Sequence, residues 1–176
     1  MKQDVRRENE LLIRGPVLGR FHEQAAMASR NETPLLLLGE TGTGKSAWAR
    51  WIHERSSRRR APLVVIDCGE IPDNLLEADL FGYRKGAFTG AGEDRPGLLA
   101  SAHPGTLVLD HLDEWRPAAQ ALLLRFLEGQ RFRPVGSLEH RQVDLRVIGL
   151  VRPELAERVR TGEFRQDLWF RLKVLE

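Results

Sequence analysis

Cysteine is almost absent from this chain of 176 residues, and its one copy, Cys68, excludes an internal disulfide framework. A lone thiol is typical of a reducing compartment, and Cys68 follows an apolar run, so we expect a small buried residue at a strand end. No apolar run approaches the ~20 residues of a membrane span. The first ten residues also lack the apolar core of a signal peptide. These absences predict a cytoplasmic protein with no membrane partner.

A strong net charge is also missing, because 27 basic and 25 acidic residues leave a formal charge of +2. The densest basic run, residues 55–60, has two interpretations: a contact with nucleic acid, or a solvated loop after a helix, where cations interact favourably with the helix C-terminus. No aromatic residue is interleaved with these arginines, which favours the loop. The content of 41% hydrophobic and 30% charged residues is typical of one globular domain.

The most specific motif is G-x-x-x-x-G-K-S, which is formed by Gly39, Glu40, Thr41, Gly42, Thr43, Gly44, Lys45 and Ser46. In such a loop the glycines let backbone N–H groups surround a phosphate, the lysine contacts the β- and γ-phosphates, and the serine hydroxyl holds Mg²⁺. An apolar run over 34–38 precedes the motif, and a helical pattern over 47–53 follows it. The motif and its context together predict binding of ATP with Mg²⁺.

Apolar runs and helical patterns alternate along the chain. We expect strands at 35–38, 63–66, 106–109, 145–150 and 172–175, and helices through about 53 and over 74–81, 98–100, 117–128 and 153–160. This alternation predicts an α/β fold with a mostly parallel sheet wrapped by helices. Ligands of such folds lie at the carboxyl ends of the strands, so the phosphate loop and the residues after 109 and 150 should converge.

The segment between the second and third strands interrupts this pattern with a glycine-rich loop. The loop consists of Gly86, Ala87, Phe88, Thr89, Gly90 and Ala91. Glycines on both sides of a lone aromatic residue suggest a mobile loop that presents an apolar tip. An ordinary hairpin with Phe88 packed in the core is the alternative, and the sequence pattern alone leaves both open.

The Gly86–Ala91 loop, its lead-in over 75–85 and the stretches 105–110, 120–125 and 164–172 give the chain a specific resemblance. The chain resembles the AAA+ ATPase domain of the bacterial enhancer-binding proteins, the NtrC-like activators of sigma-54 RNA polymerase. The resemblance covers residues 34–172 and implies a P-loop NTPase core, a three-layer α/β/α sandwich. We therefore expect a linker and first helix over 1–33 and the AAA+ core over 34–176. In the family, a helical lid and a DNA-binding domain follow.

The resemblance also implies partners and roles. Subunits of the family form a ring, usually a hexamer, with ATP between neighbours, and ATP hydrolysis moves the glycine-rich loop against sigma factor to remodel the polymerase holoenzyme. In this chain Phe88 and Thr89 would make that contact, and DNA would be bound through a domain outside the chain. Arg165 and Arg171 match the arginine fingers that reach a neighbour's γ-phosphate. Without the resemblance, both arginines would be interpreted as solvated or in intrachain ion pairs.

Three departures from the family pattern concern the catalytic positions. The family has Asp-Glu after the third strand, whereas this chain has Asp110 and His111. Asp110 can still hold Mg²⁺ together with Ser46, but the glutamate that polarises water is missing. Asp67 stands where the family has an asparagine, and Arg152 stands in the Thr-Asn pair that senses the γ-phosphate. The neighbouring acidic pair at 113–114 would align with the family's Asp-Glu pair only if this chain had an insertion relative to the family.

Two hypotheses account for these departures. In the first, a neutral His111 replaces the glutamate as the base, and Asp67 orients its imidazole. In the second, Asp67 raises the pKa of His111, an imidazolium cannot accept a proton, and the domain binds nucleotide as an interaction module without turnover. Removal of a general base typically slows a reaction by about 10²–10⁴-fold. The first reading is an ATPase of a sigma-54-dependent regulator, and the alternative is a hydrolysis-deficient module that contacts sigma factor or partner subunits.

Overall fold

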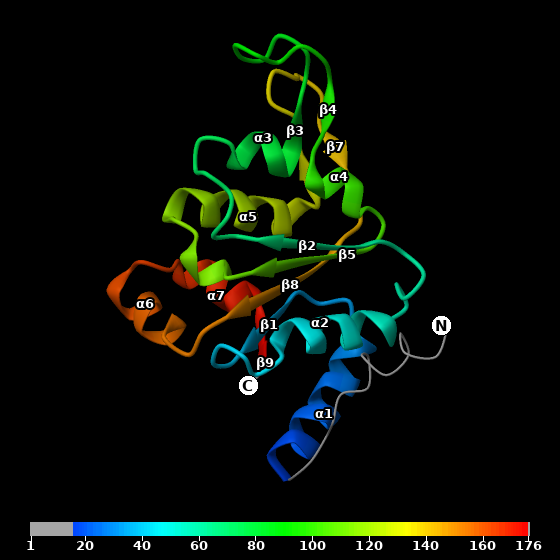
Figure 1. The fold of residues 1–176 in the computed structure, drawn as a ribbon, viewed down its shortest axis with the longest axis vertical. Helices are drawn as coiled ribbons and strands as arrows, with labels where there is room; N and C mark the ends of the chain where they lie inside the picture. The colour runs from blue at the N-terminus through cyan, green and yellow to red at the C-terminus, as the bar shows by residue number, and fades with distance from the viewer. Residues whose placement is uncertain (1–15, 176) are drawn as a thin grey trace, which may run out of the picture.

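A five-stranded parallel sheet forms the centre of the computed structural model, which describes residues 16–175. Residues 1–15, part of the linker and first helix predicted over 1–33, lie outside the described residues. The strands run in the order β2-β5-β8-β1-β9 (Figure 1). Their bounds are β1 Leu35–Leu38, β2 Leu63–Asp67, β5 Thr106–Asp110, β8 Arg146–Val151 and β9 Lys173–Leu175. All five predicted strands are thus present, and every ladder between them is parallel.

Helices cover both faces of the sheet. The first face packs on α1 (Pro16–Ser29) and α2 (Lys45–Glu54), through alternate strand residues such as Leu35, Val108 and Ile148. The intervening residues of the same strands, such as Leu36 and Leu107, face the other layer. That layer contains α3 Leu76–Phe81, α4 Leu98–Ala102, α5 Pro117–Gly129, α6 Leu155–Thr161 and α7 Gln166–Arg171. The fold is therefore the predicted three-layer α/β/α sandwich (Figure 1).

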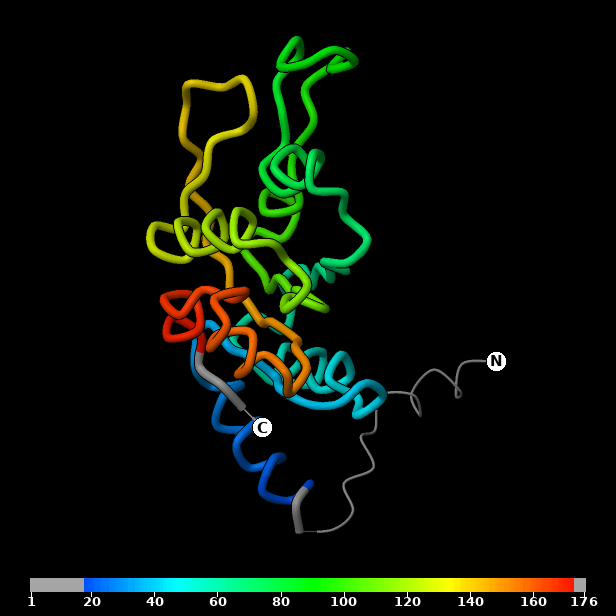
Figure 2. Tube along the Cα trace, turned by 90° about the vertical axis from the view of Figure 1, so that its left-hand side faces the viewer, coloured from blue at the N-terminus to red at the C-terminus, as the bar shows by residue number. Residues whose placement is uncertain are grey.

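Two small hairpins extend from one end of this sandwich. Strands β3 (Gly82–Tyr83) and β4 (Arg95–Pro96) enclose the glycine-rich loop, and β6 (Arg131–Phe132) pairs with β7 (Arg141–Gln142). Figure 2 shows both loops rising from the same end of the molecule. They meet at their bases, where Tyr83 and Val135 form an isolated bridge. The sequence pattern did not predict these two-residue strands or α7.

The arginine-rich run over 55–60 differs from the expected solvated loop. Its outer arginines are exposed as expected, but Arg58 has a side chain only 13% exposed. Its guanidinium forms ion pairs with Glu32 and Asp144 and donates to the carbonyl oxygen of Pro104 at 2.9 Å. Arg58 is thus a structural crosslink. Cys68 is buried, as predicted, and within 16–175 no helix is long and apolar enough to cross a membrane.

Candidate functional site

The predicted nucleotide-site residues lie at the carboxyl edge of the sheet: the phosphate loop, Asp67, Asp110, His111 and Arg152. Leu38, at the end of β1, pairs with Val151, at the end of β8, and Asp67 pairs with Asp110 across β2 and β5. The phosphate loop leaves β1 at Gly39, whose N–H donates to the carbonyl oxygen of Val151 at 3.2 Å. The parallel register therefore brings the phosphate loop and the residues that follow three other strands to one edge, as the strand pattern predicted.

The shape of the phosphate loop depends on its glycines. Gly42 and Gly44 both have φ +83°, a conformation that other residues rarely adopt. A Cβ on Gly39 would lie 2.9 Å from the hydroxyl oxygen of Thr43, which itself donates to the carbonyl oxygen of Glu40 at 2.7 Å. The loop ends where the ten-residue helix α2 begins, so free N–H groups and the positive end of a helix dipole face the loop.

The polar side chains below the loop suit Mg²⁺ and phosphate. The Lys45 ammonium donates to the carbonyl oxygens of Gly39 at 2.7 Å and Glu40 at 3.0 Å, so its charge lies along the loop. The Ser46 hydroxyl donates to Oδ2 of Asp110 at 3.1 Å. A hydroxyl and a carboxylate are oxygen ligands of the kind that Mg²⁺ prefers. The residues present therefore fit a nucleotide with its metal ion.

His111 and Asp67 contact each other, as the sequence suggested. The imidazole Nδ1 lies 3.1 Å from Oδ1 of Asp67, which also accepts the N–H of Gly69 at 3.0 Å. His111 has φ 54°, and its own N–H donates to the neighbouring Asp110 carboxylate at 3.0 Å. The hydrogen bond with Asp67 raises the pKa of His111, while partial burial opposes this and the negative charge of Asp110 adds to it. This contact therefore favours the charged imidazolium more than water would.

Arg152 has partners that the sequence pattern does not indicate. Its Nε and Nη2 lie 2.9 and 2.8 Å from Oδ2 of Asp113, and Nη2 lies 3.2 Å from Oε1 of Glu114. Both acids lie in a 3₁₀ turn, η1 (Leu112–Glu114), that follows β5. Arg152 therefore points to this turn. The acidic pair at 113–114, which was considered only as a replacement for the missing glutamate, was the one sequence signal for a partner of Arg152.

The two arginine-finger candidates lie at the ends of α7. Arg165 forms a two-pronged ion pair with Asp167, with N···O distances of 3.0 and 2.7 Å. Arg171 is exposed in the last turn of α7. Within the described part of the chain, no hydrogen bond or ion pair joins either arginine to the phosphate loop of the same chain. For Arg165, the intrachain ion pair considered from sequence is present.

The glycine-rich loop is closed on itself and exposes its aromatic residue. The N–H of Gly86 donates to the carbonyl oxygen of Ala91 at 2.8 Å, and Asp94 accepts the N–H of Lys85 at 2.8 Å. Phe88 is 43% exposed, and its ring packs edge-on against Tyr83 at 4.9 Å between centroids. The hypothesis that Phe88 packs in the core is therefore wrong.

A second loop supports the glycine-rich loop. The Arg84 N–H donates to the carbonyl oxygen of Val135 at 3.0 Å, next to the Tyr83–Val135 bridge. Gly136 has φ +76°, and a Cβ there would lie 2.7 Å from the Cβ of Ala87. This close approach requires glycine. In the sequence, the glycine at position 136 was the only sign of this contact between the two loops.

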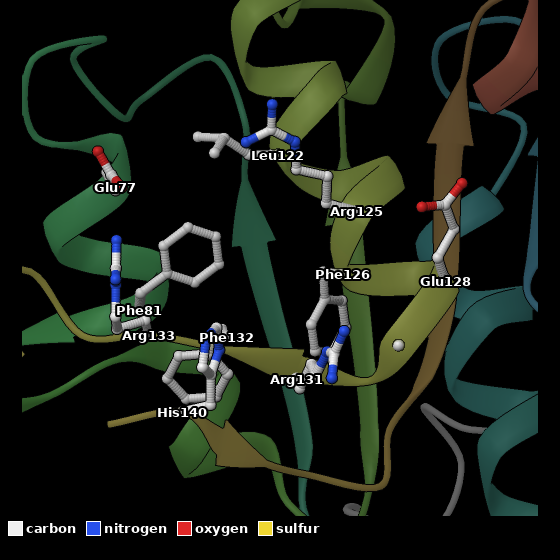
Figure 3. Close-up of a pocket in the computed structure, with 11 residues that line it drawn as sticks. Glu77, Phe81, Leu122, Arg125, Phe126, Glu128, Arg131, Phe132, Arg133 and His140 are labelled. Carbon is white, nitrogen blue, oxygen red and sulfur yellow. The ribbon is translucent and has the colours of Figure 1, made fainter. Parts of the chain in front are cut away.

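A cavity of about 510 Å³ lies between α3, α5 and β6 (Figure 3). Figure 3 shows the Phe81 ring from α3 among side chains of α5 and of the β6 segment. Phe81 and Phe132 stack with centroids 5.6 Å apart. Charged side chains surround these rings: Glu77, Arg125, Glu128, Arg131 and Arg133. None of the predicted site residues lines this cavity, so it is separate from the phosphate loop.

The fold and the phosphate loop define a P-loop NTPase domain, and comparisons with known proteins narrow the class. The family model described as the sigma-54 interaction domain matches residues 11–176, so the chain belongs to that family. The transcriptional regulator VasH of Vibrio cholerae is 44% identical over 162 residues, which are 92% of this chain and 31% of VasH.

Solved structures of NtrX from Brucella abortus agree with this assignment. The complex of NtrX with ADP superposes with a TM-score of 0.85 at 30% identity and covers 95% of this chain and 37% of that one. The complex of NtrX with ATP gives a TM-score of 0.84 at 30% identity, over 94% of this chain and 37% of that one. The chain thus spans about a third of the length of these relatives.

Proposed function

We propose that this chain binds ATP with Mg²⁺ and couples its nucleotide state to remodelling of sigma-54 RNA polymerase through the Gly86–Ala91 loop. The observation that carries the proposal is the hydrogen bond from Ser46 to Asp110, beneath a phosphate loop whose glycines adopt positive φ. NtrX, which shares the fold, has been solved with ATP and with ADP. The exposed Phe88 supports an apolar contact with sigma factor.

Each part of the site has a defined task in this proposal. Loop N–H groups and Lys45 bind the phosphates, and Ser46 and Asp110 hold Mg²⁺, which when bound neutralises phosphate charge. Arg165 and Arg171 would act across the interface of a homo-oligomeric ring, as in a hexamer, on the nucleotide of a neighbour. Release of Arg165 from Asp167 is then part of assembly. DNA would be bound by another part of the polypeptide.

Nucleotide binding is tested by calorimetric titration of the chain with ADP and with a non-hydrolysable ATP analogue in Mg²⁺ buffer. Lys45→Ala should weaken binding by at least about tenfold, because one charge-assisted phosphate contact contributes roughly 1.5–3 kcal/mol. Lys85→Ala, which removes an exposed lysine outside the phosphate loop, is the control. Equal binding by both variants would contradict the assigned site.

Contact with polymerase is tested by pull-down of sigma-54 with the full-length regulator in its ATP-analogue state. Phe88→Ala should abolish capture. Leu138→Ala removes a side chain that is 92% exposed at the tip of the neighbouring loop, so it is a matched control for the loss of exposed apolar surface. Capture that survives Phe88→Ala would argue against the loop as the contact.

A second candidate function is nucleotide-dependent interaction without hydrolysis. The contact between His111 and Asp67 favours it, because it raises the pKa of His111 and so favours the imidazolium, which cannot accept a proton. The competing hypothesis makes His111 the base, oriented by Asp67. A steady-state ATPase assay of the full-length protein separates them by comparing wild type, His111→Glu, and His111→Glu with Asp67→Asn. Turnover that appears only in the variants means that hydrolysis was lost, whereas turnover by wild type supports His111 as the base.

A further inference from the structure

A buried carboxylate lies at the carboxyl edge of the sheet, next to the proposed nucleotide site. The Asp113 side chain is 0% exposed, and its Oδ2 accepts both Nε and Nη2 of Arg152. Its other oxygen, Oδ1, has no hydrogen-bond partner within the described residues. Arg152 is thus the cation that compensates this buried charge.

Loss of this partner would be costly. A buried carboxylate left without its cation strongly destabilises a protein, so the guanidinium is firmly held. Glu114 adds a second acceptor, 3.2 Å from Nη2 of Arg152. Arg158 secures the same turn from α6, since its Nη1 donates to the carbonyl oxygen of Asp113 at 2.6 Å. Three contacts therefore fix the turn Leu112–Glu114 against the segment that follows β8.

Arg152 also lies beside the phosphate loop, at the point where the chain leaves the sheet after β8. It directly follows Val151, whose carbonyl oxygen accepts the N–H of Gly39, the first residue of the loop. A free guanidinium at this position would be a natural donor to the terminal phosphate of ATP, with which it can form charge-assisted hydrogen bonds. The ion pair with Asp113 occupies this guanidinium and keeps it from the terminal phosphate.

We propose that the Asp113–Arg152 ion pair determines nucleotide specificity: it withholds Arg152 from the terminal phosphate, so a single subunit binds ADP and ATP with similar affinity. This inference rests on the proposed nucleotide binding. It makes Arg152 a positioning residue of the turn and leaves discrimination between ATP and ADP to neighbouring subunits. The protein would then distinguish ATP from ADP only after its subunits have assembled.

The test measures the affinities of the chain for ADP and for a non-hydrolysable ATP analogue by calorimetry, at concentrations where it is monomeric. Wild type should bind the two within about threefold, since no charge-assisted bond to the terminal phosphate is added by Arg152. Asp113→Asn keeps the shape but weakens the ion pair, and it should raise the preference for the ATP analogue about tenfold. Adding Arg152→Gln to Asp113→Asn should remove this gain.

Asp144→Asn is the matched control, because it removes an aspartate from another Asp–Arg pair, at the start of β8 and away from the phosphate loop. A wild-type preference of about tenfold for the ATP analogue that Arg152→Gln abolishes would overturn the proposal, because Arg152 would then contact phosphate itself. A folded Asp113→Asn without any gain in preference would overturn it too. Failure of wild type to bind either nucleotide would instead refute the nucleotide site as a whole. If Asp113→Asn does not fold, the wild-type ratio and its response to Arg152→Gln remain decisive.

Discussion

His111 is the residue at which this chain departs most clearly from an ordinary P-loop ATPase, and its chemistry depends on one neighbour. The carboxylate of Asp67 lies 3.1 Å from Nδ1, on the adjacent strand end. Because the imidazolium is the better donor to a carboxylate, this contact raises the pKa of His111. The contact therefore favours a bound proton at the place where a base would need to be free.

The pKa of His111 provides a direct test. NMR titration of its ring protons should give a value above the ordinary 6.5, and Asp67→Asn should lower it, because the hydrogen bond to a charged acceptor is lost. Asp73→Asn, which removes an aspartate paired with Arg116 instead, should leave the titration of His111 as in wild type. A value below 6.5 in wild type would restore His111 as a candidate base.

Residue contacts could be predicted from the sequence where strand register determines them, and not elsewhere. Asp67 and Asp110 end neighbouring parallel strands, so the approach of Asp67 to His111 follows from counting residues. Asp113 lies in a 3₁₀ turn, whose direction depends on packing, and no periodicity marks it. The partners of Arg152 could therefore be found only in three dimensions.

At the scale of elements, the contact between the two protruding loops depends on Gly136. Gly136→Ala should lower the free energy of unfolding by about 1–3 kcal/mol, because the new Cβ would clash with Ala87 and the backbone has φ +76°. Gly92→Ala is the control, since nothing lies within 4 Å of a Cβ at that position. Denaturant unfolding of both variants measures the difference. Equal stability would show that the loops are not in contact.

The contact between α2 and β5 makes stability depend on pH. His53 is buried, with Nδ1 2.9 Å from the Thr106 hydroxyl, and burial lowers its pKa. The folded state thus favours the neutral ring, so its stabilising contribution is complete above the ordinary pKa of 6.5 and is lost as pH falls through the lowered folded value. The contribution of His53 to the free energy of unfolding should therefore decrease from pH 7 to pH 5.

His53→Gln should reduce this dependence on pH, because the titrating group is gone. His140→Gln, at an exposed position, should retain the wild-type slope. Urea denaturation at pH 7, 6 and 5 compares the three proteins. A wild-type slope that persists in His53→Gln would assign the effect to other groups.

The regular elements were largely predictable, because their apolar periodicity is long enough to read. All five strands and most helices begin and end within a few residues of the expected positions. The hairpins β3–β4 and β6–β7 have strands of two residues, which are too short to show alternation. Helix α7 has six residues and buries only Leu168 among its described side chains, so it carries little pattern.

At the scale of the whole molecule, Arg58 joins segments that are distant in sequence. It contacts Glu32 before β1, Pro104 before β5 and Asp144 before β8, so it closes the amino edge of the sheet, opposite the phosphate loop. Arg58→Ala should lower the free energy of unfolding by about 1–3 kcal/mol; both acidic partners are well exposed, which limits the loss. Arg59→Ala, at an exposed neighbour, is the control in thermal unfolding. Equal melting temperatures would refute the crosslink.

The alternation of strands and helices in the sequence predicted a parallel sheet wrapped by helices, and the resemblance to the AAA+ domain implied its three-layer form. The crosslink by Arg58 was not predicted, because an arginine run looks the same whether its members are solvated or paired. The sequence pattern thus predicts which elements exist and the order in which they occur. Long-range polar contacts depend on the distances between elements, which the pattern does not contain.

The paired loops have a mechanical consequence for Phe88. The glycine-rich loop is rooted on α3 through Gly82, where a Cβ would lie 2.3 Å from the carbonyl oxygen of Arg95, so this joint is tightly packed. The second loop is rooted on α5 through β6, and the two are bonded at their bases. A small rotation of α3 relative to α5 would therefore be magnified at the tip. The displacement of Phe88 would then report a change in the angle between α3 and α5.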